Sequence, residues 1–298
     1  MPLSLWPERA ISRRDAMAIG ASALIAGCSA REGSRSRPEG WYALLSDPHI
    51  ASDPAATLRG EVMADHLRAA VSDILAAGDA PRGVIINGDL AFETGAPGDY
   101  ATFADVIAPL RQHEIPVHLT LGNHDDRDAM AARLVSGPCD VPGKIVGSVD
   151  GANLRFVMLD SQDGVNVTAG RLGEPQMQWL ASNLDAHPST PTVIVVHHHL
   201  DANARPALRD TAPLLDVLRP RRQVKAVVFG HTHVWSLRTV DEIAWINLPA
   251  LGYRFQPKEP LGWLAFRPEP EGAEIELRCV GGGRSLDGLR WPLKWRSS

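Results

Sequence analysis

The stretch Thr192-Val193-Ile194-Val195-Val196-His197-His198-His199 decides the fold, because an apolar run of strand length ends abruptly in three histidines. The same arrangement, an apolar run closed by a short polar cluster, occurs four more times. The other clusters are Asp47-Pro48-His49, Gly88-Asp89, Gly122-Asn123-His124-Asp125 and Gly230-His231-Thr232-His233. Ligands of open α/β sheets lie outside the carboxyl ends of the strands, so we expect these five ends to converge on one crevice.

Strands and helices alternate from residue 41 onward. Strands are expected at 41–45, 83–87, 116–121, 192–196 and 224–229, and helices at 58–77, 99–113, 128–134, 174–186 and 211–218. Residues 146–149 and 154–159, joined through Asp150-Gly151, have the turn chemistry of a β-hairpin. The alternation predicts a mainly parallel sheet covered by helices. Residues 234–298 show only short strands, which would form a second sheet or extend an edge.

The first 40 residues are set apart from the fold. Arg13-Arg14 precedes a short apolar stretch, Ala16 to Gly27, which is too short to span a membrane and is typical of a signal peptide. The paired arginines resemble a twin-arginine export signal, and Ile25-Ala26-Gly27-Cys28 resembles a bacterial lipobox. We therefore expect a signal peptide over residues 1–27 and a flexible tether over residues 28–40. The protein would be exported, periplasmic or at the cell surface, and anchored to the membrane through a lipidated Cys28. A cytosolic helix or a misplaced start is the alternative.

Composition leaves room for one catalytic domain, over residues 41–283, with a tail over residues 284–298 that packs over a sheet edge. The formal net charge is −5 and no long basic run occurs, which argues against a nucleic-acid partner. No pair among the three cysteines has metal-ligand spacing. Cys139 and Cys279 would either form a disulfide or remain free thiols.

The residue types in the clusters point to metal chemistry. Seven of the eleven histidines, at positions 49, 124, 197, 198, 199, 231 and 233, fall in clusters that end strands. They occur together with Asp47, Asp89 and Asn123, and buried charge without a partner is costly. Imidazole, carboxylate and amide oxygen together favour divalent Mn, Fe, Zn or Ni over Ca. The sequence therefore predicts a two-metal hydrolase.

In order and spacing, the five clusters resemble the motifs of the calcineurin-like metallophosphoesterases over about residues 41 to 255. The resemblance implies an α/β fold in which two packed mixed β-sheets are flanked by helices, a four-layer α/β/β/α sandwich. It also implies two sets of metal ligands that share Asp89. One set is Asp47, His49, Asp89 and His233, and the other is Asp89, Asn123, His197 and His231.

The same resemblance implies hydrolysis of phosphodiesters or phosphomonoesters by a hydroxide that bridges the two metals. His124 would be catalytic and would protonate the leaving group. Asp125, Arg127, His198 and His199 would lie beside the ligands or contact substrate; alternatively, the two histidines are solvated and Arg127 forms a surface ion pair. Phe92 stands where purple acid phosphatases have a tyrosine ligand. The compact group of class III cyclic-nucleotide phosphodiesterases and glycerophosphodiesterases remains, although His199 replaces that group's usual proline.

A different class of function is a non-catalytic exported lipoprotein that uses the phosphoesterase fold as an interaction scaffold. Such scaffolds have usually lost ligands, whereas every ligand position is filled here.

Overall fold

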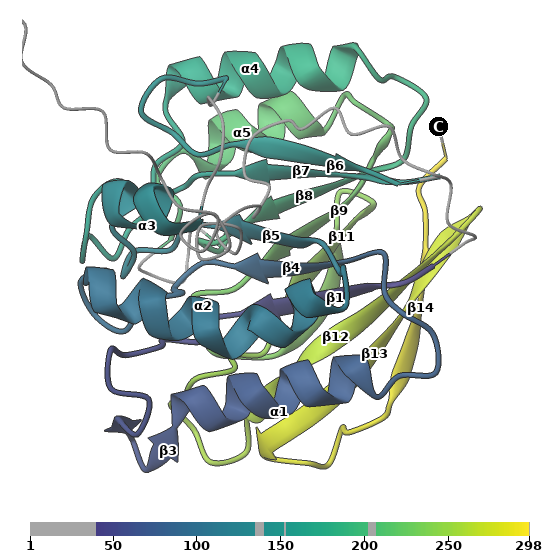
Figure 1. Ribbon diagram of the computed structural model, residues 1–298. Helices are drawn as coiled ribbons and strands as arrows, with labels where there is room; N and C mark the ends of the chain where they lie inside the picture. The colour runs from purple at the N-terminus through teal and green to yellow at the C-terminus, as the bar shows by residue number, and fades with distance from the viewer. Residues whose placement is uncertain (1–39, 135–139, 152, 202–206, 298) are drawn as a thin grey trace, which may run out of the picture.

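The structure is a computed structural model that describes residues 40–134, 140–151, 153–201 and 207–297. The predictions for residues 1–39, including the signal peptide and Cys28, lie outside this part. Two six-stranded sheets pack face to face, and helices cover both outer faces, so the molecule has four layers (Figure 1). The predicted fold class is therefore confirmed. Within the described residues, no helix combines the length and the apolar composition that crossing a bilayer requires.

The first sheet has the strand order β14-β13-β12-β1-β4-β5. Its strands are β1 (Tyr42–Ser46), β4 (Gly83–Asn87), β5 (Val117–Thr120), β12 (Pro260–Glu269), β13 (Gly272–Gly282) and β14 (Arg290–Lys294). Strands β1, β4 and β5 are parallel, whereas β12 joins β1 in the antiparallel sense and continues into β13 and β14. The chain thus returns at its C-terminal end to complete the sheet with which it began.

The second sheet has the order β10-β11-β9-β8-β7-β6. Its strands are β6 (Gly147–Asp150), β7 (Arg155–Leu159), β8 (Thr192–Val196), β9 (Val224–Phe229), β10 (Ser236–Val240) and β11 (Ile243–Asn247). The four inner strands are parallel, and β6 and β10 are antiparallel at the two edges. The pairing of β6 with β7 confirms the predicted hairpin.

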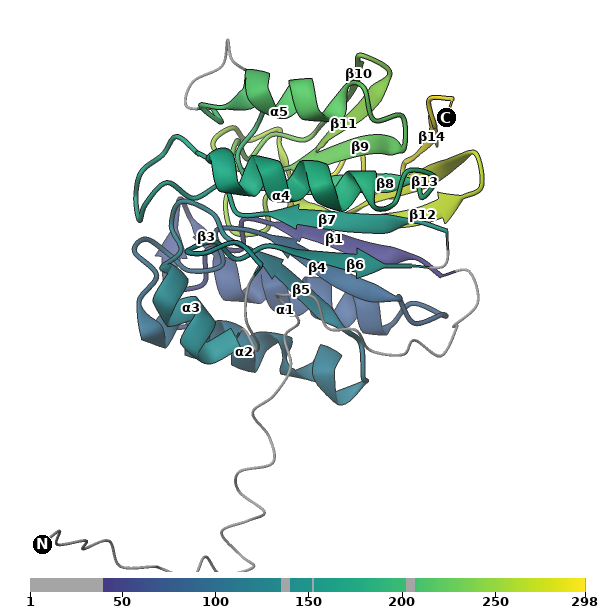
Figure 2. The ribbon, with the colours of Figure 1, turned by 90° about the horizontal axis from the view of Figure 1, so that it is seen from above.

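In the part of the chain that the structure describes, five helices complete the outer layers (Figure 2). The helices α1 (Met63–Leu75), α2 (Pro97–Gln112) and α3 (Arg127–Leu134) pack on the first sheet, and α4 (Glu174–Asp185) and α5 (Thr211–Leu218) pack on the second. In strand β1, Ala43 and Leu45 face the helices, while Leu44 faces the other sheet. Both faces of the strand are therefore buried, as expected for a parallel strand.

The predictions made from the sequence were wrong in two places. The parallel strands do not share one sheet, because β1, β4 and β5 lie in the first sheet and β7, β8 and β9 in the second. Residues 58–62, predicted to begin a helix, instead belong to the hairpin of β2 (Thr57–Leu58) and β3 (Glu61–Val62). Arg59 and Gly60 form its turn with φ values of 52° and 83°, which a helix does not allow.

The C-terminal strands extend both sheets at their edges. Residues 290–294 of the expected tail form β14, which hydrogen-bonds to β13 and is itself the edge strand. The segment continues to Trp295 and Arg296, whose side chains are buried, and Arg296 donates to the carbonyls of Val224 and Leu218. Among the described residues, Cys279 is a buried thiol outside any disulfide. Its expected partner, Cys139, lies outside the described residues.

Candidate metal centre

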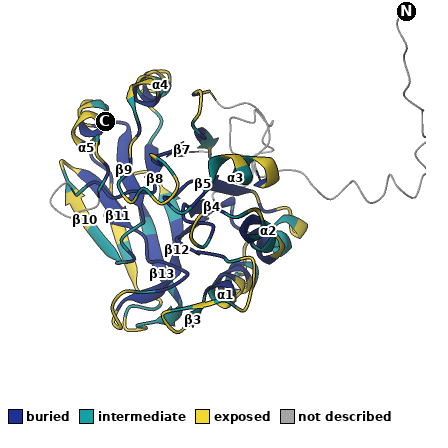
Figure 3. Ribbon diagram, turned by 90° about the vertical axis from the view of Figure 1, so that its left-hand side faces the viewer, coloured by how far each residue is buried: buried dark blue, intermediate teal, exposed yellow. Residues whose placement is uncertain are grey.

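The five polar clusters lie at the carboxyl ends of strands from both sheets, at the end of the molecule that faces the viewer in Figure 3. Asp47 follows β1 directly, Asp89 follows β4 by two residues, and Asn123 follows β5 by three. His197 follows β8 directly, and His231 lies two residues after β9. The first sheet therefore supplies the carboxylates and the amide, and the second sheet supplies imidazoles.

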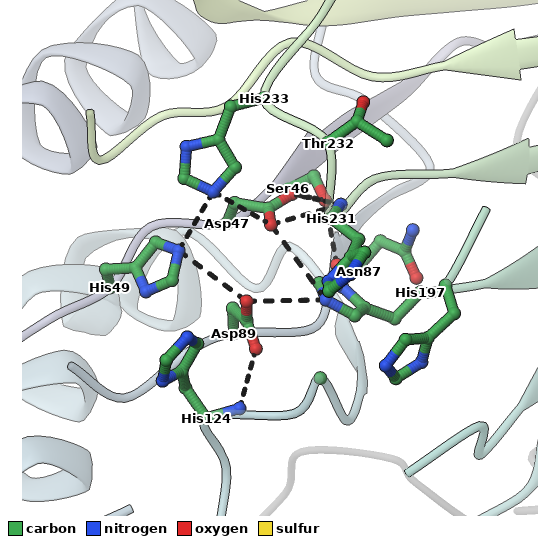
Figure 4. A network of polar contacts seen from close by, with 12 residues as sticks. Ser46, Asp47, His49, Asn87, Asp89, His124, His197, His231, Thr232 and His233 are labelled. Atoms are coloured by element: carbon green, nitrogen blue, oxygen red, sulfur yellow. Dashed lines mark hydrogen bonds and ion pairs between the residues drawn. The ribbon is translucent and has the colours of Figure 1, made fainter. Parts of the chain in front are cut away.

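The Asp89 carboxylate lies in the middle of the cluster (Figure 4). Its Oδ2 is 3.6 Å from His49 Nε2 and 3.4 Å from His197 Nε2. Its Oδ1 accepts a hydrogen bond of 2.9 Å from the backbone N–H of His124. One carboxylate thus faces imidazoles on two sides, which is the position required of a group that bridges two cations.

Three overlapping groups of donor atoms surround this carboxylate, and within each group all atoms lie within 4.8 Å of one another. The groups are Asp47, His49 and His233; His49, Asp89 and His124; and Asp89, His197 and His231. In the first group, His49 Nε2 lies 3.2 Å from His233 Nε2, and His233 Nε2 lies 3.4 Å from Asp47 Oδ1. The structure therefore brings six of the predicted ligands into these groups: Asp47, His49, Asp89, His197, His231 and His233.

Two buried donor atoms identify the side of the cluster where Asn123 lies. Asn123 Oδ1 and His197 Nε2 are buried, and neither makes a hydrogen bond among the described residues. A buried polar atom without a partner costs about 1–3 kcal/mol. A cation bound by the Asn123 oxygen would remove that cost and would take the place of the proton on His197 Nε2, so the residues present fit a metal ion.

Backbone carbonyls hold the imidazoles in one orientation. The Nδ1 atoms of His49, His197 and His233 face the carbonyl oxygens of Phe92, Asn87 and Tyr253 at 3.4, 2.9 and 2.7 Å. A carbonyl accepts, so Nδ1 carries a proton and Nε2 is the ring atom turned toward the carboxylates. Metal-binding histidines are oriented in this way by hydrogen bonds behind the ring.

The carboxylate charge of the cluster favours the binding of a cation. Burial lowers the pKa of His49 to about 4 and that of His231 to about 3, so both rings are neutral near pH 7. Burial alone would raise the pKa of Asp47, but the positive charge on His197 and the contacts with His233 lower it to about 2. The same interactions act on His197: burial opposes its charge, yet Asp89 and Asp47 raise its pKa to about 10. In the protein alone, a proton on His197 balances part of the carboxylate charge that divalent cations would balance.

Strained backbone is concentrated at the same residues. Five of the predicted ligands have φ between 49° and 68°, a region that side chains other than glycine rarely adopt: Asp47, His49, Asp89, His231 and His233. Each such residue costs of order 1–3 kcal/mol, and strain of this kind persists where function requires it. The glycines of the clusters serve close approach, because a Cβ on Gly122 would overlap the Asp89 carboxylate and one on Gly88 would overlap His197.

His124 is placed differently from the buried imidazoles. Its ring is only partly buried, and its Nδ1 lies 2.9 Å from the carbonyl oxygen of Glu93. The ring centroid is 5.2 Å from that of His49. Nδ1 is thus engaged by the Glu93 carbonyl, and Nε2 is the ring atom that remains available.

The other predicted residues surround the cluster. Asp125 is buried and accepts hydrogen bonds from three backbone N–H groups, and burial, reinforced by the charge of Asp89, raises its pKa to about 6. Arg127 forms a two-pronged ion pair with Asp160, at 2.8 and 3.0 Å. His198 and His199 are buried against His231, with ring centroids 4.7 and 6.0 Å from it, so neither is solvated.

Sequence reasoning missed three residues that organise the site. Asn87, at the end of β4, donates 3.2 Å to the carbonyl of Val196 on the other sheet. Asp160, directly after β7, is the buried partner of Arg127. Tyr253 packs its ring 4.5 Å from that of His233. Asn87 and Asp160 could have been identified from the sequence, because each is a polar residue at the end of an apolar run. No sequence pattern identifies Tyr253.

Comparisons with known proteins agree with this geometry. The calcineurin-like phosphoesterase family matches residues 41–235. A probable cyclic nucleotide phosphodiesterase of Rhodococcus erythropolis is 32% identical over 71% of this chain and 70% of its own length. The 3′,5′-cyclic adenosine monophosphate phosphodiesterase CpdA of Haemophilus influenzae is 29% identical over 81% of this chain and 86% of its own.

Among solved structures, a dimetal phosphatase from Danio rerio superposes with a TM-score of 0.66 at 19% identity, over 87% of this chain and all of that one. The fold, the donor cluster at the strand ends and the match across most of the described sequence lead to one conclusion: this chain belongs to the calcineurin-like phosphoesterase family.

Proposed function

We propose that the protein is a binuclear metal-dependent phosphodiesterase that acts on cyclic nucleotides. The observation that carries the proposal is a chain of three donor groups, joined to one another through His49 and Asp89. Relatives named as cyclic nucleotide phosphodiesterases support the choice of a diester substrate. Asp47, His49, Asp89 and His233 would hold one divalent transition-metal ion, and Asp89, Asn123, His197 and His231 the other.

When bound, the cations supply Lewis acidity for the phosphoryl oxygens and make water more acidic. The protein's own part is orientation and proton transfer. The carbonyl-anchored imidazoles and the Asp89 carboxylate would hold the cations in place. Hydrolysis forms a bond from phosphorus to the oxygen of water and breaks the bond to the leaving oxygen. With its Nδ1 proton directed to Glu93 O, a protonated His124 donates the Nε2 proton to that leaving oxygen.

The test combines metal analysis with a substrate panel. We expect purified protein to hold about two transition-metal ions per chain and to hydrolyse cyclic AMP in preference to phosphomonoesters. Protein that holds two metals but cleaves no phosphate ester would favour the interaction scaffold. Removal of metal with a chelator should abolish activity, and re-addition of Mn²⁺, Zn²⁺, Ni²⁺ or Fe²⁺ should identify the ion that restores it.

We also propose that the protein is exported and anchored through Cys28. Support comes from the sequence alone, from the paired arginines and the cysteine that follows Gly27. Replacing Arg13 and Arg14 with lysine should retain an active, metal-loaded precursor in the cell. Cys28→Ser should release active protein from the membrane fraction. Normal export and lipidation of the double-lysine variant would rule out the twin-arginine route but leave the phosphoesterase proposal unaffected.

A further inference from the structure

Aromatic rings extend outward from one side of the metal centre. The Tyr253 ring lies 4.8 Å from His49 and 4.5 Å from His233, between centroids. The Phe255 ring follows, 4.8 Å from His233. Phe255 is 50% exposed, although it touches a buried ligand. A large apolar ring is thus presented to solvent directly beside the donor atoms.

Arg59 lies over the same ring. Its guanidinium carbon is 4.7 Å from the Phe255 centroid and 6.0 Å from that of Tyr253. Arg59 occupies the turn of the β2–β3 hairpin, and that hairpin is tied to the segment carrying Phe255 by a 3.2 Å contact between Glu61 and Arg254. Glu61, the acidic residue of the hairpin, pairs with Arg254 and His66, so it does not neutralise Arg59.

A second exposed apolar residue lies next in the chain to a residue that contacts Asn123. Val165 is 38% exposed, and the next residue, Asn166, donates a backbone hydrogen bond of 2.7 Å to the carbonyl of Asn123. Large hydrophobic side chains are exposed at only three places in the described part of the chain: Val165, Phe255 and Leu289. Two of the three therefore border the donor cluster, where a substrate's organic group would lie.

We propose that Phe255 and Arg59 form a stacking platform that binds the nucleobase of the substrate and so determines its class. The inference rests on the proposed phosphodiesterase function. A planar base gains by stacking against the exposed Phe255 ring and the planar guanidinium that lies over it, and the positive charge of Arg59 favours an anionic nucleotide. A glycerol group has no flat surface to stack. The platform therefore selects nucleotides over glycerophosphodiesters, a choice that the metal ligands cannot make.

The test compares Phe255→Leu, which keeps an apolar side chain but loses the ring, with Phe255→Trp, which keeps a ring. Leu289→Ala is the matched control, because Leu289 is exposed to a similar extent, 46%, on the turn before β14. For Phe255→Leu we expect KM for cyclic AMP to rise at least about fivefold, with kcat little changed. KM for glycerophosphoglycerol should not change. Phe255→Trp should retain the wild-type KM, and Arg59→Ala should act as Phe255→Leu does.

A binding measurement separates the platform from catalysis. Calorimetric titration with 5′-AMP should show weaker binding to Phe255→Leu, whereas inorganic phosphate should bind equally to both proteins. Equal changes with the nucleotide and the glycerol diester, or no change with either, would overturn the platform. If the wild type cleaves no diester but binds 5′-AMP through Phe255, the phosphodiesterase proposal fails and the platform stands.

Discussion

Asp125→Ala should destabilise the protein strongly, although Asp125 is not among the predicted metal ligands. Its buried carboxylate accepts hydrogen bonds from the backbone N–H groups of Leu90 at 3.2 Å, Ala91 at 3.0 Å and Gly122 at 2.8 Å. It also accepts one from Tyr100 Oη at 3.1 Å. One side chain therefore joins the loop after β4, which carries Asp89, to the loop after β5, which carries Asn123.

The magnitude follows from the backbone groups left behind. Alanine leaves three buried N–H donors without a partner, and each costs about 1–3 kcal/mol. Water that enters the space, together with relief of the repulsion between Asp125 and Asp89, offsets part of this sum. We expect the free energy of unfolding to fall by about 3–5 kcal/mol, a large fraction of the 5–15 kcal/mol typical of a domain. Tyr100→Phe, which leaves the N–H of Asp126 unpaired, should cost only about 1–2 kcal/mol.

Urea unfolding of the metal-free proteins measures this difference directly. Metal titration of the folded variants should also show weaker binding for Asp125→Ala, because the loops that carry Asp89 and Asn123 lose their common anchor. A loss of less than about 1 kcal/mol would refute the reasoning, since it would mean that the three amides do not depend on the carboxylate.

Three further predictions concern the predicted ligands, the pH dependence of stability and the burial of Cys279. Asp89→Asn should lose metal and activity together, whereas His124→Ala should retain metal and lose about 10²–10⁴ in kcat, most with poor leaving groups; equal metal loss by inductively coupled plasma mass spectrometry would make His124 a ligand. Metal-free protein should lose stability as pH falls from about 6.5 toward 4, because the unfolded chain then binds protons that folded His49 (pKa about 4) and His231 (pKa about 3) do not. Each contributes up to about 1.4 kcal/mol per pH unit, and His49→Gln should reduce the slope measured by urea unfolding. Burial, with the charge of Asp287, raises the pKa of Cys279 to about 11, so at pH 8 iodoacetamide should label it roughly a hundredfold more slowly than in the unfolded chain; fast labelling seen by peptide mass spectrometry would contradict the burial.

The sequence by itself determined which residues gather at the site. An apolar run that ends in Asp, Asn or His is a local pattern, and a strand end is set mainly by that pattern. The clusters after β1, β4, β5, β8 and β9 can therefore be recognised in the amino-acid sequence alone. The β6–β7 hairpin was equally local, since its turn chemistry lies between the two strands it joins.

Only the tertiary structure decided how the strands are divided between two sheets. The runs ending at Asn87 and at Val196 are equally apolar, so hydrophobicity alone places both in the core without saying which neighbour each strand pairs with. Pairing depends on register and on packing between distant segments, as in the Asn87–Val196 hydrogen bond between the sheets.

The same holds for contacts made by single side chains. Arg127 reaches Asp160, Asp125 gathers three backbone amides, and Arg59 lies over Phe255 because the elements that carry them pack together. No periodicity in the sequence encodes such contacts, since each joins segments far apart along the chain. Local sequence was thus enough to predict the donor residues. The contacts of Asp160 and Asp125, and the position of the Phe255 ring, depend on the packing of the whole fold.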